Sequence, residues 1–475
     1  MMKKILIGAG AFFGVLLIAL IGASIYLSSL INEDFIVQQL ESSMNCRVEI
    51  KELNTGLFSA VSSIGLEGVK LGPRDAVANK GTPQKDRKPM AAGVIEAGSI
   101  KLALQFGPLL SKKLVVDKLV IDQAKLNLVI LANGGNNLNA LFRTPQIVNG
   151  ERNPALDAPK EEAAVESGSD KPFTAADLPI SGSLKKIGFT NSNAAIKLQS
   201  TGETIEIADL DLLLTNIDID GTDLKNHNSA HLEIDTTASI LNRQKVKKLK
   251  LILTSSGKIV PFDVKTGKVN PAIQYHLTVN KGSTLHSFAV LDALAGSLPV
   301  LKNIGLKMDK LSKEAVLLQN VDVVISYSRS LLKLLNEPTF PTRNYDLALR
   351  KGSWIRLSNS THNMIGKVIS SEAESKAGIA HVDSEIQKVV KGDAANAKMI
   401  RDKLLGSLVE NDRVFLAFTS TGSLGNPNVS LLSNIPSITD LLKGSINEAI
   451  NNRVNNELKK VPGGKQINDA LKGLF

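Results

Sequence analysis

The chain has a single cysteine, Cys46, among its 475 residues. One thiol excludes an internal disulfide and a cysteine-based metal site, and it does not identify the redox compartment. A nucleophilic thiol is one interpretation of Cys46. The favoured one is a small buried side chain near the start of a strand.

Aromatic residues are also scarce, at 4% of the chain, with one tryptophan and four tyrosines. This argues against binding of single-stranded nucleic acid, which needs aromatic stacking platforms. The formal charge is +10, but the lysines and arginines are scattered. The densest basic run, residues 245–250, favours a solvated strand face over a DNA-binding patch, and no nucleic-acid partner is expected.

Motifs for catalysis are missing as well. The sequence has neither a phosphate-binding loop nor a Gly-x-Ser-x-Gly element. His227 and His231 could flank a metal, but no obvious carboxylate completes the site, so two surface histidines are favoured. Asp218 and Asp220 resemble half of a calcium loop without its closing glutamate. The sequence therefore predicts no enzyme, no metal site and no cofactor.

A long apolar stretch stands at the N-terminus. Residues 5–32 carry no charge over 28 positions and follow Lys3 and Lys4. A bilayer span needs about 20 residues, whereas the apolar part of a signal peptide has about 7–15. We therefore expect an uncleaved anchor over residues 1–32, with a signal peptide as the alternative. The positive-inside rule places the N-terminus in the cytoplasm and the bulk of the chain across the membrane.

Beyond this stretch most segments alternate apolar and polar residues, which is typical of half-buried strands. Residues 34–45 differ, since Ile36 and Leu40 have helical spacing. A phase slip at Ala208 and Asp209 predicts a β-bulge. Later segments, residues 330–336 and 371–408, have helical preferences.

Residues 143–182 interrupt the strand pattern with five prolines and many small or acidic residues. This composition predicts a flexible linker and the main internal boundary. The expected domains are an anchor at 1–32, an N-terminal β-rich segment at 33–142, the linker at 143–182, a β-rich groove domain with helical insertions at 183–430, and amphipathic helices at 431–475. The expected fold class is mainly β with α, in which a long curved antiparallel sheet or groove follows the transmembrane helix.

A sheet with one aliphatic face must bury that face. It can do so by closing into a sandwich or barrel, or by forming a groove filled by an apolar ligand, and alternation alone leaves these open. The aligned aliphatic positions are candidates for lining one shared interior: Leu102, Leu104, Phe106, Leu126, Leu128, Ile130, Leu232, Ile234, Leu249, Leu251, Leu253, Leu416 and Phe418.

The order of several short motifs resembles the AsmA family of bacterial envelope proteins. The motifs lie at residues 47–50, 57–58, 66–72, 100–110, 119–122 and 134–138, then at 184–189, 194–196, 207–216 and 232–240, and finally at 422–427. The resemblance is strong up to about residue 142, moderate over residues 183–260 and weak over residues 281–410.

The resemblance implies a bacterial inner-membrane protein with a periplasmic β-groove, related to bridge-like lipid-transfer proteins. It implies that the groove binds or conducts phospholipid in support of outer-membrane lipid homeostasis. The expected partners are phospholipid, the membrane, and outer-membrane or periplasmic proteins. Two alternatives stay open: a scaffold that affects outer-membrane protein assembly without binding lipid, and an unrecognised envelope enzyme.

Overall fold

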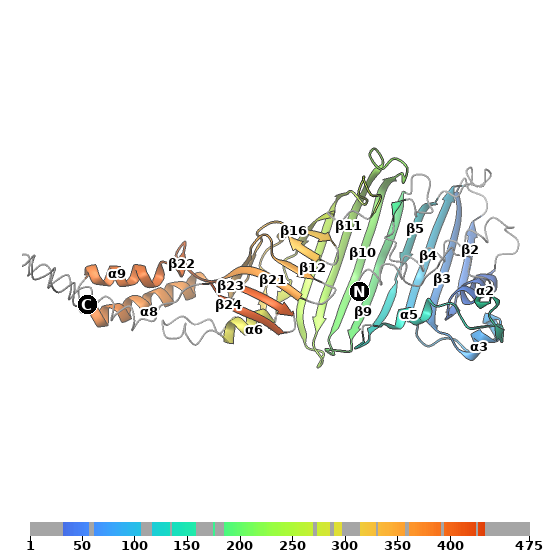
Figure 1. Ribbon diagram of the computed structural model, residues 1–475, viewed down its shortest axis with the longest axis horizontal. Coiled ribbons are helices and arrows are strands. Elements are labelled where there is room, and N and C mark those ends of the chain that lie inside the picture. The colour runs from blue at the N-terminus through green and yellow to red at the C-terminus, as the bar shows by residue number, and fades with distance from the viewer. Residues whose placement is uncertain are drawn as a thin grey trace, which may run out of the picture. The chain divides into compact units, whose positions relative to one another are not determined.

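The computed structural model (Figure 1) describes residues 32–56, 61–105, 116–133, 135–157, 174–175, 185–268, 273–285, 289–296, 314–328, 331–356, 361–390, 394–423 and 426–432. The described part of the chain is mainly β, as predicted, and it divides into two compact units. Unit 1 comprises Met1–Leu285, Gln319–Asn336 and Trp354–Ser360, and unit 2 comprises His286–Leu318, Glu337–Ser353 and Thr361–Phe475.

The two predicted terminal segments are almost wholly outside this description. Only residue 32 of the expected anchor, and residues 431 and 432 of the expected C-terminal helices, are among the described residues. Of the helices that the structure describes, none has the length and apolar character that a membrane crossing requires.

Unit 1 is built around one large sheet. Its strands are β1 (Cys46–Glu49), β2 (Glu52–Gly56), β3 (Val61–Pro73), β4 (Ile95–Gln105), β5 (Val116–Asp122), β6 (Lys125–Ile130), β9 (Lys186–Leu198), β10 (Thr204–Ile219), β11 (Asn228–Leu241), β12 (Lys247–Ile259), β13 (Ile273–Val279), β14 (Thr284–Leu285), β16 (Val321–Ser328), β17 (Leu331–Leu334) and β20 (Trp354–Arg356). Its short helical elements are α2 (Glu33–Ser43), α3 (Ala76–Asn79), η1 (Gln84–Asp86), α5 (Asn137–Leu141) and η2 (Pro154–Leu156).

The sheet is mixed rather than purely antiparallel, which corrects the sequence prediction. From one edge, β1 and β2 both pair with β3, followed by β4, then β5 and β6, then β9 to β12. Strand β9 runs parallel to β5 and β6, and the other described pairings are antiparallel. A parallel pair needs a long crossover, and the 55 residues between Ile130 and Lys186 provide one.

Helix α2 confirms the helix predicted over residues 34–45. Asn32 caps it by accepting a hydrogen bond from the Phe35 backbone N–H at 2.9 Å. Ile36 and Leu40 are almost fully buried, at 1% and 0% exposure, because this side of the helix packs on the sheet. The helical spacing of the apolar residues therefore reports a real packing face.

The bulge predicted near Ala208 is also confirmed, and it belongs to a line of irregularities across the sheet. Gln123, Asn191 and Asp209 all have positive φ angles, near 50°. Hydrogen bonds connect the neighbouring strands at these positions. Gln123 N–H donates to Thr190 O at 2.9 Å, and Asn191 N–H donates to the Asp211 carboxylate at 2.7 Å. An inserted residue shifts the alternation of a strand by one position. The apolar residues before and after the bulges, whose sequence pattern changes phase there, therefore project to the same face of the sheet.

The predicted boundary at residues 143–182 does not divide the sheet, because β9 pairs directly with β5 and β6. Its first part is ordered: β7 (Ile147–Val148) and β8 (Glu151–Arg152) form a hairpin. Buried Asn153 donates to Pro145 O at 2.8 Å, so hydrogen bonds replace the apolar burial that this composition lacks. Farther on, Ala175 N–H donates to Gly267 O at 2.7 Å. Residues 158–173 and 176–184 lie outside the described residues.

Unit 2 combines strands with longer helices. Its strands are β15 (Ala315–Val316), β18 (Thr339–Pro341), β19 (Tyr345–Leu349), β21 (Thr361–Ser370), β22 (Val409–Glu410), β23 (Arg413–Ser423) and β24 (Asn426–Leu431), and its helices are α6 (Ala289–Gly296), α8 (Glu372–Val390) and α9 (Ala394–Leu405). Strands β18, β19, β21, β23 and β24 pair in that order, all antiparallel.

Two local predictions have opposite outcomes. The helical preference of residues 371–408 is confirmed by α8 and α9. The short helix predicted at 330–336 is wrong, because Leu331–Leu334 forms strand β17 between β16 and β20. A run of leucine and lysine favours a helix in isolation, and cross-strand pairing overrides that preference.

Two glycines test the register of the sheet. A Cβ added to Gly188 in β9 would lie 2.0 Å from Leu212 O in β10. We expect Gly188→Ala to destabilise unit 1 by about 1–3 kcal/mol, because relieving the overlap requires the backbone to move. A Cβ on Gly257 in β12 meets nothing within 4 Å, so Gly257→Ala should be neutral or stabilising by about 0.5–1 kcal/mol. Thermal denaturation of both variants checks this, and equal melting temperatures would contradict the close approach of β9 and β10.

Candidate functional site

One side of the unit 1 sheet, called here the aliphatic face, carries continuous rows of apolar side chains. Residues opposite one another in paired strands project to the same side of a sheet. Members of all four rows join one apolar cluster. The rows are Leu71, Ile95, Leu126, Ala194, Ile207, Ala238 and Leu251; Leu53, Leu66, Ile100, Ile121, Phe189, Leu212 and Ile234; Ile64, Leu102, Leu119, Ile187, Leu214 and Leu232; and Leu128, Ile196, Ile205, Ile240 and Leu249.

Most of the residues singled out from the sequence lie on this face. Leu102, Leu126, Leu128, Ile130, Leu232, Ile234, Leu249, Leu251 and Leu253 belong to the rows or extend them, since Ile130 lies opposite Leu198 and Leu253 lies opposite Thr236. Of Leu104, the structure describes only the backbone, which lies in β4 opposite Ser62. Phe106 lies outside the described residues.

Leu416 and Phe418 belong to unit 2 and are 0% and 1% exposed. They lie on β23 opposite Val368 and Gly366 of β21, in the packed interior of that unit. Complete burial makes them core residues of unit 2, so the aliphatic face is described from unit 1 alone.

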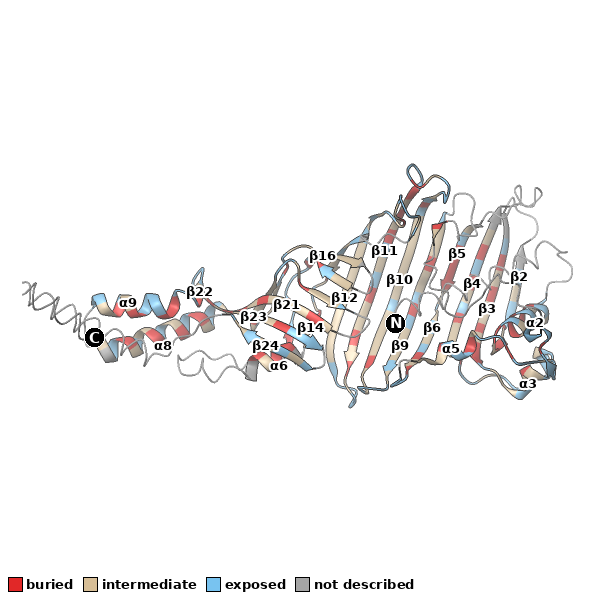
Figure 2. Ribbon diagram, viewed as in Figure 1, coloured by how far each residue is buried: buried red, intermediate tan, exposed pale blue. Residues whose placement is uncertain are grey.

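Burial changes along the aliphatic face. At the β3–β6 end, α2 and α5 cover it, and Leu66 and Leu102 are at most 1% exposed. On β9 to β12 most row residues become partly exposed, with Ile207, Ile234 and Leu251 as examples, whereas Leu232 stays buried. Figure 2 shows this change as red positions on β3 and β4 and tan positions along β10 and β12. The face therefore continues well beyond the two helices that cover its first part.

The most informative part of this face was missed in the sequence. Strands β9 and β10 supply eight row residues that were not among the candidates: Ile187, Phe189, Ala194, Ile196, Ile205, Ile207, Leu212 and Leu214. Bulges at Asn191 and Asp209 change the phase of alternation within each strand. Reading each half-strand with its own phase would have found them.

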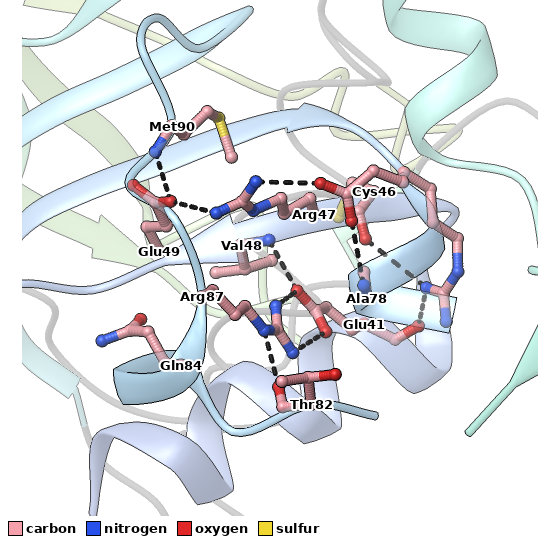
Figure 3. Close-up of polar contacts among 12 residues, drawn as sticks. Glu41, Cys46, Arg47, Val48, Glu49, Ala78, Thr82, Gln84, Arg87 and Met90 are labelled. Atoms are coloured by element: carbon pink, nitrogen blue, oxygen red, sulfur yellow. Dashed lines mark hydrogen bonds and ion pairs between the residues drawn. The ribbon is translucent and has the colours of Figure 1, made fainter. Parts of the chain in front are cut away.

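A buried polar cluster holds α2 against the covered end of the sheet (Figure 3). The Glu41 carboxylate of α2 accepts two hydrogen bonds from the Arg87 guanidinium, at 2.6 and 2.9 Å. It also accepts the Val48 backbone N–H of β1 at 2.9 Å. Both charged side chains are at most 5% exposed, so this is a paired, hydrogen-bonded buried ion pair.

A second set of contacts joins the loop after β3 to β1 and to the end of α2. The Arg47 guanidinium pairs with Glu49 at 2.6 Å and with Asp75 at 2.8 Å. Glu49 also accepts the Met90 backbone N–H at 2.5 Å. Arg74 donates to the Glu41 backbone carbonyl at the end of α2, at 2.5 Å. Helix, loop and strand are therefore joined by directional bonds as well as by apolar packing.

Chemically reactive groups are few in the part of the chain that the structure describes. Burial and the nearby Glu41 carboxylate raise the pKa of the Cys46 thiol to about 12, so the thiol stays protonated at neutral pH. His227 Nδ1 lies 2.8 Å from the Asp218 carboxylate, and that hydrogen bond raises the histidine pKa. The described residues contain no group of three or more side chains arranged to hold a metal.

No protein-family model matches this chain, and no curated protein matches it significantly.

The buried ion pair gives a direct test of how α2 is held. Arg87→Met leaves the Glu41 carboxylate buried without its partner, which should cost about 3–5 kcal/mol. The matched control is Arg152→Met, because the Arg152–Asp157 pair is 72% and 61% exposed. Loss of an exposed pair should cost at most about 1 kcal/mol. Chemical denaturation measures both, and equal small losses would show that the buried pair does not hold α2 in place.

A buried histidine predicts how unit 2 responds to acid. His362 is 1% exposed, and its Nε2 lies 2.7 Å from Ser420 Oγ. Burial lowers the pKa of His362. As pH falls below about 6.5, the unfolded chain binds the proton before the folded one. The stability of unit 2 should therefore fall from that pH down to the lowered folded pKa, and no further below it.

The measurement is the melting temperature of unit 2 between pH 7.5 and pH 4.5. His362→Gln should flatten the slope just below pH 6.5, and His381→Gln, at an exposed position on α8, should leave it unchanged. An unchanged slope in His362→Gln would refute the assignment.

Proposed function

We propose that this protein binds phospholipid through acyl chains that lie on the aliphatic face of β9 to β12. The observation that carries the proposal is the continuation of the rows beyond the helices that cover their first part: all four rows reach β11, and two of them reach β12. On β9 to β12 most of these side chains are partly exposed. Apolar surface of this extent in contact with water favours an apolar partner.

The chemistry of the face fits acyl chains. On β9 to β12 the four rows contain only aliphatic residues and one aromatic residue, Phe189, and no charged residue. An aliphatic surface without ring-stacking partners suits flexible hydrocarbon chains, whose binding is driven by area removed from water. Polar groups that would fix the orientation of a rigid ligand are missing from the rows. These properties favour lipids as a class over a defined aromatic or polar small molecule.

The resemblance to the AsmA family supports the same proposal from the sequence. It suggests an inner-membrane protein with its bulk in the periplasm and a role in outer-membrane lipid homeostasis. Helix α2 begins directly after the predicted anchor, and the Glu41–Arg87 pair holds it rigidly on the sheet. In this proposal the rigid attachment holds the aliphatic face close to the membrane from which lipid is drawn. The proposed role is binding and conduction, without catalysis.

Adjacent residues of β12 give a sharp test of the acyl-binding face. Leu251 lies opposite Ala238 on the aliphatic face, whereas Ile252 lies opposite Thr237 on the other side of the sheet, and both are half-exposed. A carboxylate beside acyl chains costs several kcal/mol unless water or a cation reaches it. We expect Leu251→Asp in the full chain to lose most of its co-purifying phospholipid, and Ile252→Asp to retain it. Mass spectrometry of bound lipids measures the difference.

Circular dichroism and thermal melting accompany the lipid analysis. Leu251→Asp should stay folded, because its side chain already reaches water in part. If both variants keep the wild-type amount of lipid, the aliphatic face is not the binding surface. If the wild-type chain itself carries no lipid, the alternative of a scaffold without lipid binding is favoured instead.

A further inference from the structure

The turn between β11 and β12 has an unusual composition. We call residues 242–250 the basic hairpin: they include five cations and no acidic residue. Val246, which pairs with Asn242 across the turn, is 48% exposed and stands between two lysines. An exposed aliphatic side chain flanked by cations is the local composition of segments that lie in a lipid headgroup layer. The cations are Arg243, Lys245, Lys247, Lys248 and Lys250.

The turn is held in one conformation. Asn242 accepts the Val246 backbone N–H on its side-chain oxygen at 2.8 Å and donates its own backbone N–H to Val246 O at 2.9 Å. Lys245 adopts a positive φ of 63°, and its ammonium donates to Thr204 Oγ1 of the neighbouring strand at 2.9 Å. These bonds fix the backbone of the turn at Val246, whose side chain is exposed in that conformation.

The hairpin stands where the aliphatic rows end. Ile240 lies opposite both Ile205 and Leu249, and these are the last row residues before the turn. The loop between β10 and β11, at the opposite end of these strands (Figure 1), carries Asp220 and Asp223. The two turns therefore differ in composition: the basic hairpin carries five cations and no acidic residue, whereas the loop at the opposite end mixes Asp220 and Asp223 with Lys225.

We propose that the basic hairpin docks on the surface of a membrane that contains anionic phospholipid, with Val246 between the headgroups and the cations on the phosphates. This inference rests on the proposed function, since it identifies the end of the aliphatic face at which headgroups are held. The aliphatic stems of the lysines cover apolar surface while their ammonium groups reach the phosphates. A lipid with its chains along the rows then has its phosphate among the cations and not beside Asp220.

The test uses the full chain, immobilised through a C-terminal affinity tag and kept soluble by an uncharged amphipathic polymer. It captures fluorescent vesicles of phosphatidylcholine, either pure or with 30% phosphatidylglycerol. The variant is Arg243→Gln with Lys247→Gln, both exposed, so the Lys245–Thr204 bond that orders the turn is kept. The matched control is Lys258→Gln with Lys265→Gln, two exposed cations toward the other end of the sheet.

Each cation near an anionic surface strengthens binding about fivefold, so the hairpin variant should capture the phosphatidylglycerol vesicles about 25-fold less tightly. The control should stay within about twofold of the wild type. Val246→Ser should also weaken capture, without any change of charge. Equal losses in hairpin variant and control would overturn the proposal, because they would show that net charge alone attracts the vesicles. Capture of pure phosphatidylcholine vesicles as strongly as the anionic ones would also overturn it.

A separate readout distinguishes this inference from the proposed function. Lipid that co-purifies on the aliphatic face should be unchanged in Val246→Ser, because the rows are intact. If the wild-type chain captures anionic vesicles through the hairpin but carries no bound lipid, the proposed function fails and the docking surface stands. If lipid is bound and the hairpin variants capture vesicles normally, the docking surface fails alone.

Discussion

The structure depends on one constraint: among the residues that the structure describes, the aliphatic face of unit 1 is wider than the elements that cover it. Alternation along β3 to β12 places an apolar side chain at every second position, and cross-strand register aligns these positions into rows. Two short helices, α2 and α5, cover the first part of the rows. Most of the remaining row residues are partly exposed. The apolar side chains of β9 to β12 are therefore the part of this face that an apolar partner could still cover.

The covered end of the sheet shows how rigidity is obtained where aromatic residues are scarce. Aliphatic packing is not directional, and by itself it would allow α2 to slide along the sheet. The Glu41–Arg87 pair and the Arg47 and Arg74 contacts add directional bonds at fixed positions. A buried ion pair adds little net stability over an apolar pair. Its contribution here is to fix where the helix lies on the sheet.

The line of bulges through Gln123, Asn191 and Asp209 connects fold and site. A long strand with strict alternation would need no correction. These strands shift phase at this line, and the residue inserted at Asn191 keeps Ile187 and Ile196 on the same side of the sheet. Bulges also increase the local twist of a sheet. The apolar side chains thus stay on one side of the sheet although bulges interrupt the regular strand pairing.

The sequence by itself determined the mainly β character, helix α2, the bulge near Asp209 and nine of the apolar positions on the face, because a two-residue or four-residue period is a local property of the chain. It did not determine the parallel pairing of β9 with β5 and β6, the ordered hairpin at residues 147–152, or the strand at Leu331–Leu334. Nor could it separate Leu416 and Phe418, which lie in the core of unit 2, from Ile234, which is half-exposed in unit 1. Burial depends on what covers a side chain, and the covering residues come from distant parts of the sequence, so only the tertiary structure decided it.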